Sequence, residues 1–413
     1  MENSSNTIDN NMDNMTEADR NVAAENQSIW KFCITGGPCG GKTTALARIY
    51  SFLKDRGFEV CTAPETYGIL ASNGMSMDFY STDGMASFIQ NSVLDVQIAL
   101  EDSLVRVLKA RGGKGVLLCD RGGMDGAAYL DDEGWQKVLR ERNVCETDLR
   151  DSRYNAVFHL VTAADGAEKF YTLENNQVRR ENVEEARVVD QQTQKVWTGH
   201  PSLYLLDNST DFEGKMQRLI SIVAKHVGLP SNLSKRSAKY LLRGVPDMKD
   251  FTVEYHMFEV EKVYLKVSDT LEDGDNDSAG SYSFIRKRTT LDKNGEKGGS
   301  VYQITEVTKK NSGEETELKR IISGREYTAA YKSRDLSRHV IRQMRINFLY
   351  KKQSFAIHFY RTPSTGLCII HAQVESADGD VPVVNLPPFL DVERQLQGKQ
   401  DEDSYGSYAL SLL

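Results

Sequence analysis

The sequence lacks an apolar run long enough to form a membrane-spanning helix. Its first residues also lack the features of a secretory leader, because they are rich in Asn, Asp and Ser and show no basic stretch followed by an apolar one. We therefore expect a cytoplasmic protein with no transmembrane segment. The polar composition of residues 1–27 predicts that they are disordered.

The sequence also has few cysteines and no net positive charge. The six cysteines, at positions 33, 39, 61, 119, 145 and 368, show no metal-ligand spacing and are typical of reduced thiols in an intracellular protein. The 51 Lys and Arg residues are outnumbered by 59 Asp and Glu, which gives a formal charge of −8. No overall field attracts nucleic acid, so we expect no nucleic-acid partner and only local sites for anions.

What the chain does have is enough sequence for two folded units, because 413 residues exceed most single domains. Between residues 28 and 230, short apolar strands alternate with helical stretches. This predicts a parallel α/β fold with three layers, whose ligands bind at the carboxyl ends of the strands.

Residues 231–247 resemble a linker. Residues 248–398 show long alternating strands with hairpin turns, which predicts a mainly antiparallel β domain, either solvated on one face or closed into a barrel with a polar lumen. Residues 399–413 are predicted to be a loosely held tail, with docking on the protein or on a partner as the alternative.

A complete phosphate-loop motif follows the first predicted strand. The motif comprises Gly36, Gly37, Pro38, Cys39, Gly40, Gly41, Lys42 and Thr43, and Thr44 comes next. Its glycines let main-chain N–H groups surround phosphate oxygens, its lysine reaches the outer phosphates, and the Thr43 hydroxyl can bind Mg²⁺ at a helix N-terminus. The expected ligand is a nucleoside triphosphate with Mg²⁺, either GTP or ATP.

Charged residues follow two neighbouring predicted strands. Asp120 ends one strand and is followed by Arg121, and Glu65 follows another. Asp120 can hold Mg²⁺ or accept a proton from a substrate hydroxyl, and Arg121 can bind an anionic group. Glu65 is a second candidate base or substrate contact. The alternatives are a turn-capping role for Asp120 and a helix-capping or salt-bridge role for Glu65.

The polar stretch from 175 to 190 contains Arg179, Arg180 and Arg187. Arginines on a closing lid would neutralise charge on a transferred phosphoryl group. The alternative is an exposed helix with internal Glu–Arg pairs.

These motifs together carry a family resemblance. The glycine loop, Glu65 with Thr66, the Asp120-Arg121-Gly122 run and the arginine-bearing stretch resemble the NadR-like ATPase or kinase-like domain found in the TRPL translocation defect protein family. The resemblance implies a nucleotide-binding protein, with GTP favoured. It also implies recognition of phosphorylated inositol lipids, peripheral contact with membranes and a role in membrane-protein trafficking.

The β domain resembles the CYTH, or triphosphate tunnel, fold, whose hallmark strand reads Glu-x-Glu-x-Lys. Here Glu259 and Glu261 match, but Val263 replaces the lysine. The closing Glu-x-Glu strand appears as Gln373-Val374-Glu375, so one acid is a neutral amide. The basic residues expected to line the tunnel are Arg286, Arg288, Lys309, Lys319, Arg320, Arg342 and Arg345. If they converge, they form a channel for a polyphosphorylated ligand. The alternative is that they point into water.

Three functions remain open at this point. The first is a nucleotide-regulated protein that binds a second, polyphosphorylated ligand such as a phosphoinositide headgroup. The second is a small-molecule kinase that uses Asp120 or Glu65 as its base. The third is a tunnel triphosphatase, which the loss of two hallmark residues makes less favoured.

Overall fold

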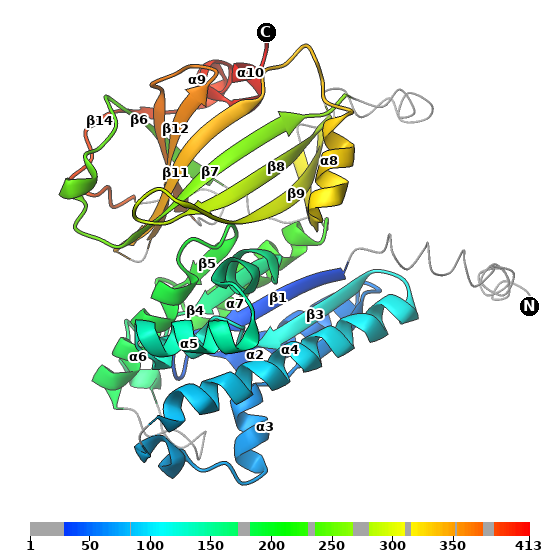
Figure 1. Cartoon of the computed structure of the whole chain (residues 1–413), viewed down its shortest axis with the longest axis vertical. Helices are drawn as coiled ribbons and strands as arrows, with labels where there is room; N and C mark the ends of the chain where they lie inside the picture. The colour runs from blue at the N-terminus through cyan, green and yellow to red at the C-terminus, as the bar shows by residue number, and fades with distance from the viewer. Residues whose placement is uncertain are drawn as a thin grey trace, which may run out of the picture.

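The computed structural model describes residues 29–82, 84–171, 182–229, 236–266, 281–309, 315–351, 353–374 and 384–413. It contains a five-stranded parallel sheet and a nine-stranded antiparallel sheet, which occupy the lower and upper halves of Figure 1. The predicted combination of an α/β fold with an antiparallel β fold is confirmed. The segment 1–27, expected to be disordered, lies outside the described residues.

The parallel sheet has the strand order β2-β3-β1-β4-β5. Its strands are β1 (Ile29–Thr35), β2 (Glu59–Ala63), β3 (Gly115–Asp120), β4 (Ala156–Leu160) and β5 (Leu203–Leu206). Because β1 lies at the centre with β3 and β4 on either side, the loop that follows it meets the ends of both neighbours. This is the edge of an open parallel sheet at which ligands bind.

Helices cover both faces of the parallel sheet. One core lies under α2 (Lys42–Lys54) and α7 (Phe212–His226). The other core lies under α4 (Met85–Arg111), α5 (Asp132–Arg142) and α6 (Val183–Trp197). The remaining short elements are α3 (Thr66–Ser72), η2 (Met77–Ser81), η3 (Asp125–Tyr129), η4 (Asp148–Ser152) and η5 (Glu168–Phe170). The result is the predicted three-layer arrangement.

The antiparallel sheet has the strand order β10-β9-β8-β7-β11-β12-β13-β6-β14. Its strands are β6 (Arg236–Leu242), β7 (Tyr255–Tyr264), β8 (Tyr282–Leu291), β9 (Lys297–Lys309), β10 (Glu315–Ile322), β11 (Ile341–Tyr350), β12 (Gln353–Thr362), β13 (Cys368–Val374) and β14 (Val392–Leu396). Short helices accompany it: η6 (Met248–Asp250), α8 (Gly324–Tyr331), α9 (Gly398–Tyr405) and α10 (Ser407–Leu410). Among the described strand pairs, β10 and β14 are edges, so the sheet is open and does not form the closed barrel that the tunnel resemblance implied.

Two segments of this half differ from the sequence expectation. Residues 236–242, inside the predicted linker 231–247, form β6 between β13 and β14. The apolar pattern of these residues is too weak to predict a strand. The strand forms because pairing with β13 and β14 stabilises it more than local preference does.

The predicted loose tail is instead packed against the sheet. The Tyr408 ring stacks on Tyr282 with centroids 4.3 Å apart, and the Arg338 guanidinium lies 3.6 Å from the Tyr408 ring centroid. Arg338 also donates a 2.8 Å hydrogen bond to the main-chain carbonyl of Tyr408. Side chains distant in sequence therefore hold the C-terminal residues against the sheet. The sequence of the tail alone does not predict these contacts.

Candidate functional site

The phosphate loop lies between β1 and α2, in the predicted order of strand, glycine loop and helix. Gly36 has φ +134°, and a Cβ added there would lie 2.1 Å from the Leu160 carbonyl oxygen. Gly40 is similarly close to that oxygen. Glycine is required at Gly36 because the loop passes directly over the end of β4. Thr43 and Thr44 lie exposed in the first turn of α2.

Lys42 is folded against this loop. Its Nζ donates hydrogen bonds to the carbonyl oxygens of Gly36 and Gly37, at 3.0 and 2.9 Å. Burial, reinforced by the Arg121 guanidinium, lowers the pKa of Lys42 to about 8, although Glu65 and Asp120 oppose that change. An anion at the loop would therefore favour the charged form of this side chain.

Asp120 lies at the carboxyl end of β3, as predicted. Its Oδ1 is buried and has no hydrogen-bond partner in the described part of the chain. Burial raises the pKa of Asp120 to about 6, with Lys42 opposing this effect and Glu65 adding to it. A buried carboxylate oxygen without a donor is the kind of group that a hard divalent cation can satisfy, so the residue fits the expected Mg²⁺ site.

Arg121 joins three parts of this edge. Its Nε donates to Glu65 Oε1 at 3.2 Å, and its Nη1 donates to the Gly36 carbonyl at 3.0 Å. Burial would lower the pKa of Arg121, but Tyr129 and Glu65 outweigh it and keep the group charged. Glu65, whose side chain is 40% exposed, precedes α3 and makes no capping hydrogen bond. Of the two alternative roles for Glu65, the structure therefore shows the salt bridge, with Arg121 as its partner.

Sequence reasoning assigned no role to Asp125, which fixes the turn after β3. Asp125 Oδ1 accepts hydrogen bonds from Thr35 Oγ1 at 2.6 Å and Trp197 Nε1 at 3.0 Å, and its Oδ2 accepts one from the Gly122 N–H at 2.6 Å. The residue stands five positions after Asp120, but only the fold shows that its partners come from β1 and α6.

Asp190 was also missed, although it lies within the stretch read as a lid. Its Oδ1 accepts a 2.8 Å hydrogen bond from the Gly37 N–H and a 3.1 Å bond from the Thr162 N–H, and lies 3.0 Å from His159 Nε2. Burial would raise the pKa of Asp190, but His159 and the Gly37 N–H hold it below its usual value. Asp190 therefore anchors the phosphate loop to α6.

Of the predicted lid arginines, only Arg187 falls within the described residues. Arg179 and Arg180 lie outside them. Arg187 donates to Glu168 at 2.9 Å, to Glu184 at 3.2 Å and to the Ala164 carbonyl at 2.7 Å. Arg187 lies on α6 and is paired with glutamates. This matches the alternative interpretation of a helix with Glu–Arg pairs, and not that of a lid arginine.

The predicted ligand residues of the β domain divide between the two faces of the antiparallel sheet. Residues directly opposite each other on paired strands share a face. On β7 and β8, Lys262 lies opposite Arg286, whereas Glu261 lies opposite Lys287. We call the side that bears Lys262 and Arg286 the cation face. The strand registers also place on it Arg288, Arg345, Gln303 and Lys319.

The remaining candidates on described strands lie on the opposite face, so the predicted convergence of all these residues is wrong. Glu259 pairs with Lys297 at 2.5 Å. Glu261 accepts hydrogen bonds from Tyr327 at 3.0 Å and Arg342 at 3.1 Å. The register also places Arg320 with this second group. The prediction was wrong because a Glu-x-Glu spacing fixes a common face but does not say which face that is. The Lys309 side chain and Glu375 lie outside what the structure describes.

The cation face carries positive charge in a partly buried setting. Burial, with Arg345 and Arg286 nearby, holds the pKa of Lys262 well below its usual value, although Glu317 opposes this. Burial and Arg286 also lower the pKa of Arg345 to about 9. These shifts mean that burying these cations, and to a smaller extent holding them together, destabilises the folded chain, and a bound anion would relieve that cost.

Several buried polar atoms on the same face make no hydrogen bond. Within the described residues, the buried atoms without a hydrogen bond include Arg288 Nη1, Tyr264 Oη, Thr305 Oγ1, Gln343 Nε2 and Asn347 Oδ1, all from this face. Unsatisfied buried polar groups are uncommon in folded proteins and call for water or a ligand.

The comparisons with known proteins concern the first half of the chain. A family model described as an AAA domain matches residues 31–215, which indicates a P-loop NTPase-like domain, a type that binds nucleotide together with Mg²⁺. Among curated proteins, none matches this chain. The narrower resemblance to the TRPL translocation defect family and the CYTH description of the β domain stay predictions. Across the described residues, no helix combines the length and apolar character needed to cross a bilayer.

Proposed function

We propose that this protein binds a purine nucleoside triphosphate with Mg²⁺ at the phosphate loop and a polyphosphorylated ligand on the cation face. The proposed second ligand is a phosphoinositide headgroup or a molecule of the same chemistry. The preference for GTP and the role in membrane trafficking are taken from the family resemblance. The single observation behind the second site is the convergence of Lys262, Arg286 and Arg345 on one partly buried face.

At the phosphate loop, each component of a nucleotide site is held by a separate element. Gly36 and Gly41 allow the tight turn, Lys42 supplies the mobile charge, and Thr43 and Asp120 would hold Mg²⁺. The bound cation would neutralise charge on the outer phosphates. Asp190 holds the Gly37 N–H, so the loop is fixed before a nucleotide arrives.

On the cation face, Glu317 lies among these cations, 2.9 Å from Lys319. The two arginines can offer paired N–H donors to a phosphate group, which lysines alone cannot do. The two hallmark glutamates lie across the sheet from these groups. This separation favours binding of an anion over metal-dependent cleavage of a triphosphate.

Lys42→Ala tests the nucleotide site. Loss of one charge-assisted contact should weaken triphosphate binding by about 1.5 to 3 kcal/mol, or roughly ten- to 150-fold. The measurement is calorimetric titration of the full chain with a non-hydrolysable nucleotide and Mg²⁺. Lys54→Ala, at the far end of the same helix and paired with Glu59, is the matched control. Equal affinity in Lys42→Ala and the wild type would rule out the proposed nucleotide site.

Arg286→Glu tests the second site. Reversing one charge on the cation face should reduce binding to phosphatidylcholine vesicles that contain phosphatidylinositol bisphosphate by at least tenfold. The neighbouring Lys287→Glu makes the same charge change on the opposite face and should have little effect. Equal losses in the two variants would point to non-specific attraction and contradict the proposal.

A thermal-shift experiment tests which nucleotide base the first site prefers and which ligand the second site binds. A ligand that prefers the folded state raises the melting temperature, so GTP, ATP and soluble inositol phosphates are compared on the same sample. A larger shift with ATP than with GTP would overturn the guanine preference and leave the purine nucleotide site in place.

A small-molecule kinase is the second candidate, and Asp120 favours it. Its buried, unpartnered oxygen and raised pKa are typical of a general base close to neutral pH. In that reaction the substrate hydroxyl oxygen bonds to the terminal phosphorus, its proton passes to Asp120, and the nucleoside diphosphate leaves. Transfer of labelled phosphate from nucleotide to a metabolite, abolished in Asp120→Asn, would establish this activity. No transfer in the wild type across a metabolite extract would count against it.

A further inference from the structure

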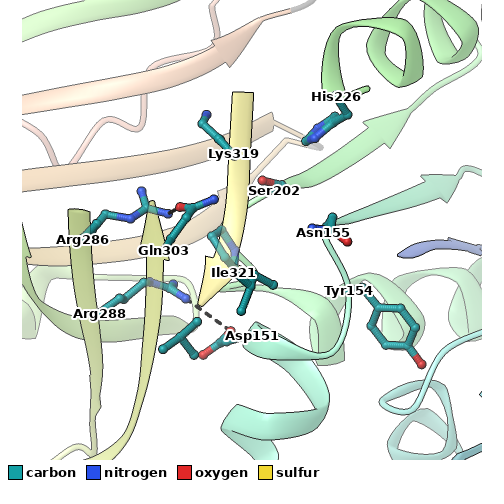
Figure 2. Close-up of a pocket in the computed structure, with 12 residues that line it drawn as sticks. Asp151, Tyr154, Asn155, Ser202, His226, Arg286, Arg288, Gln303, Lys319 and Ile321 are labelled. Atoms are coloured by element: carbon teal, nitrogen blue, oxygen red, sulfur yellow. Dashed lines mark hydrogen bonds and ion pairs between the residues drawn. The ribbon is translucent and has the colours of Figure 1, made fainter. Parts of the chain in front are cut away.

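A pocket lies between the two halves of the molecule, at the edge of the cation face (Figure 2). Arg286, Arg288 and Lys319 line it from the antiparallel sheet. Asn155 and Ser202 line it from the first half, just before β4 and β5. The wall opposite the arginines is therefore built from the N-terminal edge of the parallel sheet, far from the phosphate loop at its carboxyl edge.

The two halves are joined at this pocket by a buried ion cluster. Arg288 Nη1 lies 3.2 Å from Asp151 Oδ1, and Asp151 also pairs with Arg150 at 2.9 Å. Arg288 is 5% exposed and its guanidinium carbon lies 3.3 Å from the centroid of the Phe258 ring. Its Nη2 donates to the Gly199 carbonyl of the first half. Arg288, predicted to bind ligand, thus also fixes the halves together.

This cluster leaves donor capacity unused. Despite the short distance to Asp151, Arg288 Nη1 makes no hydrogen bond of acceptable geometry among the described residues. Arg286 donates to Gln303, whose side chain also lines the pocket. Figure 2 shows the Arg286 and Gln303 side chains meeting from neighbouring strands on one side of the pocket, with Ser202 and Asn155 on the other side. Three cations thus lie beside two carboxylates, Asp151 and Glu317, and an incoming anion would balance the remaining positive charge.

We propose that this pocket completes the anion site, so that one phosphate-bearing ligand contacts both halves of the chain at once. The inference rests on the proposed second site and adds that the first half supplies part of it. The ligand class is a compact molecule with several phosphate groups, one of which enters the pocket and interacts with Arg286 and Lys319 on one side and with Ser202 on the other. Because the ligand bridges the halves, its binding stabilises their docking. Any change that loosens the docking therefore lowers the affinity for the ligand.

Ser202→Asp tests this inference, because it places a negative charge in the pocket from the first half alone. The probe is inositol hexakisphosphate, titrated into the full chain with the phosphate loop filled by a non-hydrolysable nucleotide and Mg²⁺. We expect at least a tenfold loss of affinity relative to Ser202→Asn, which has nearly the same size but no charge. Phosphatidylinositol bisphosphate in phosphatidylcholine vesicles is the second arm and shows whether a lipid headgroup also reaches the pocket.

The outcomes separate the two proposals. If Arg286→Glu abolishes binding but Ser202→Asp and Ser202→Asn bind equally, the second site stands and its composite nature is refuted. If neither Arg286→Glu nor Ser202→Asp changes affinity, both fail. Binding in solution alone or to vesicles as well supports the site and identifies the source of the phosphate.

Hydrogen exchange on the unaltered chain provides a check that needs no substitution. Inositol hexakisphosphate should slow exchange at residues 199–203 as well as along β8. Protection confined to the antiparallel sheet would overturn the composite site.

Discussion

The two candidate sites would bind phosphate by different physical means. At the loop after β1, main-chain groups of consecutive residues do most of the work, with one lysine and one aspartate beside them. On the cation face, side chains from several strands supply the charge. A site of the first kind is encoded within eight residues of sequence. A site of the second kind exists only if many strand registers are right.

The difference extends to what each site is like before its ligand arrives. Asp190, Asp125 and Arg121 hold the loop and its neighbouring turn by hydrogen bonds. On the cation face, burial lowers the pKa of Lys262 and Arg345, and polar atoms remain without partners. The loop is thus pre-organised, whereas the cation face holds its positive charges close together at a cost that an anionic ligand would relieve.

The largest effect is expected where the two regions meet. Asp151→Ala removes the carboxylate that lies between Arg150 and Arg288, both at most 5% exposed. Leaving buried cations without this partner should reduce the free energy of unfolding by about 3 to 5 kcal/mol. Denaturant unfolding of the full chain measures it. Asp148→Ala, an exposed residue of the same short helix, is the control, and similar losses in both variants would show that the ion cluster is unimportant.

Asp120→Asn should have the opposite sign and a smaller size. Because the pKa of Asp120 is about 6, above the usual value near 4, the folded chain binds a proton more tightly than the unfolded chain does. Stability is therefore highest below about pH 4 and is lost as pH rises through about 6.

The amide removes this penalty, so the ligand-free variant should be more stable than the wild type by about 1 to 3 kcal/mol at neutral pH. Thermal melting over a pH series measures the difference, which should disappear in acid. A gap that does not change with pH would show that the carboxylate is not strained. It would then weaken the contrast with the pre-organised groups around it.

The smallest effect tests the cation face itself. Arg345→Gln should weaken inositol hexakisphosphate binding about tenfold, which corresponds to about 1.4 kcal/mol. Arg342→Gln lies on the same strand but on the opposite face, where Arg342 pairs with Glu261, and should leave affinity nearly unchanged. Calorimetric titration compares them. If Arg342 matters as much as Arg345, the division of the sheet into two faces does not govern binding.

The sequence was sufficient for features with a short local signature. The phosphate loop, the strand that ends at Asp120 and the parallel order of the first half all follow from periodicity and glycine spacing, and the structure has them. The roles of Asp125 and Asp190 could not be inferred, because their partners lie 90 and 153 residues away along the chain. A single carboxylate in a polar stretch carries no sign of such a contact.

The antiparallel half was predicted less completely for a related reason. Its strands follow from alternation, but Glu259 and Arg286 were assigned to one site although register places them on opposite faces. Alternation shows which residues share a face within one strand. It does not show how one strand aligns with the next, and a shift of one residue reverses the answer. The same limit hid β6, whose neighbours β13 and β14 are distant in sequence.

The position of Trp197 gives the nucleotide edge an optical probe of its own. The indole is fully buried, donates to Asp125 and lies so close to Gly122 that a Cβ there would be 2.6 Å away. The other two tryptophans, Trp30 and Trp135, can be replaced by phenylalanine to leave a single emitter against the turn that follows Asp120. Its emission would then report, without any attached dye, how that turn responds in real time when a nucleotide is mixed with the protein.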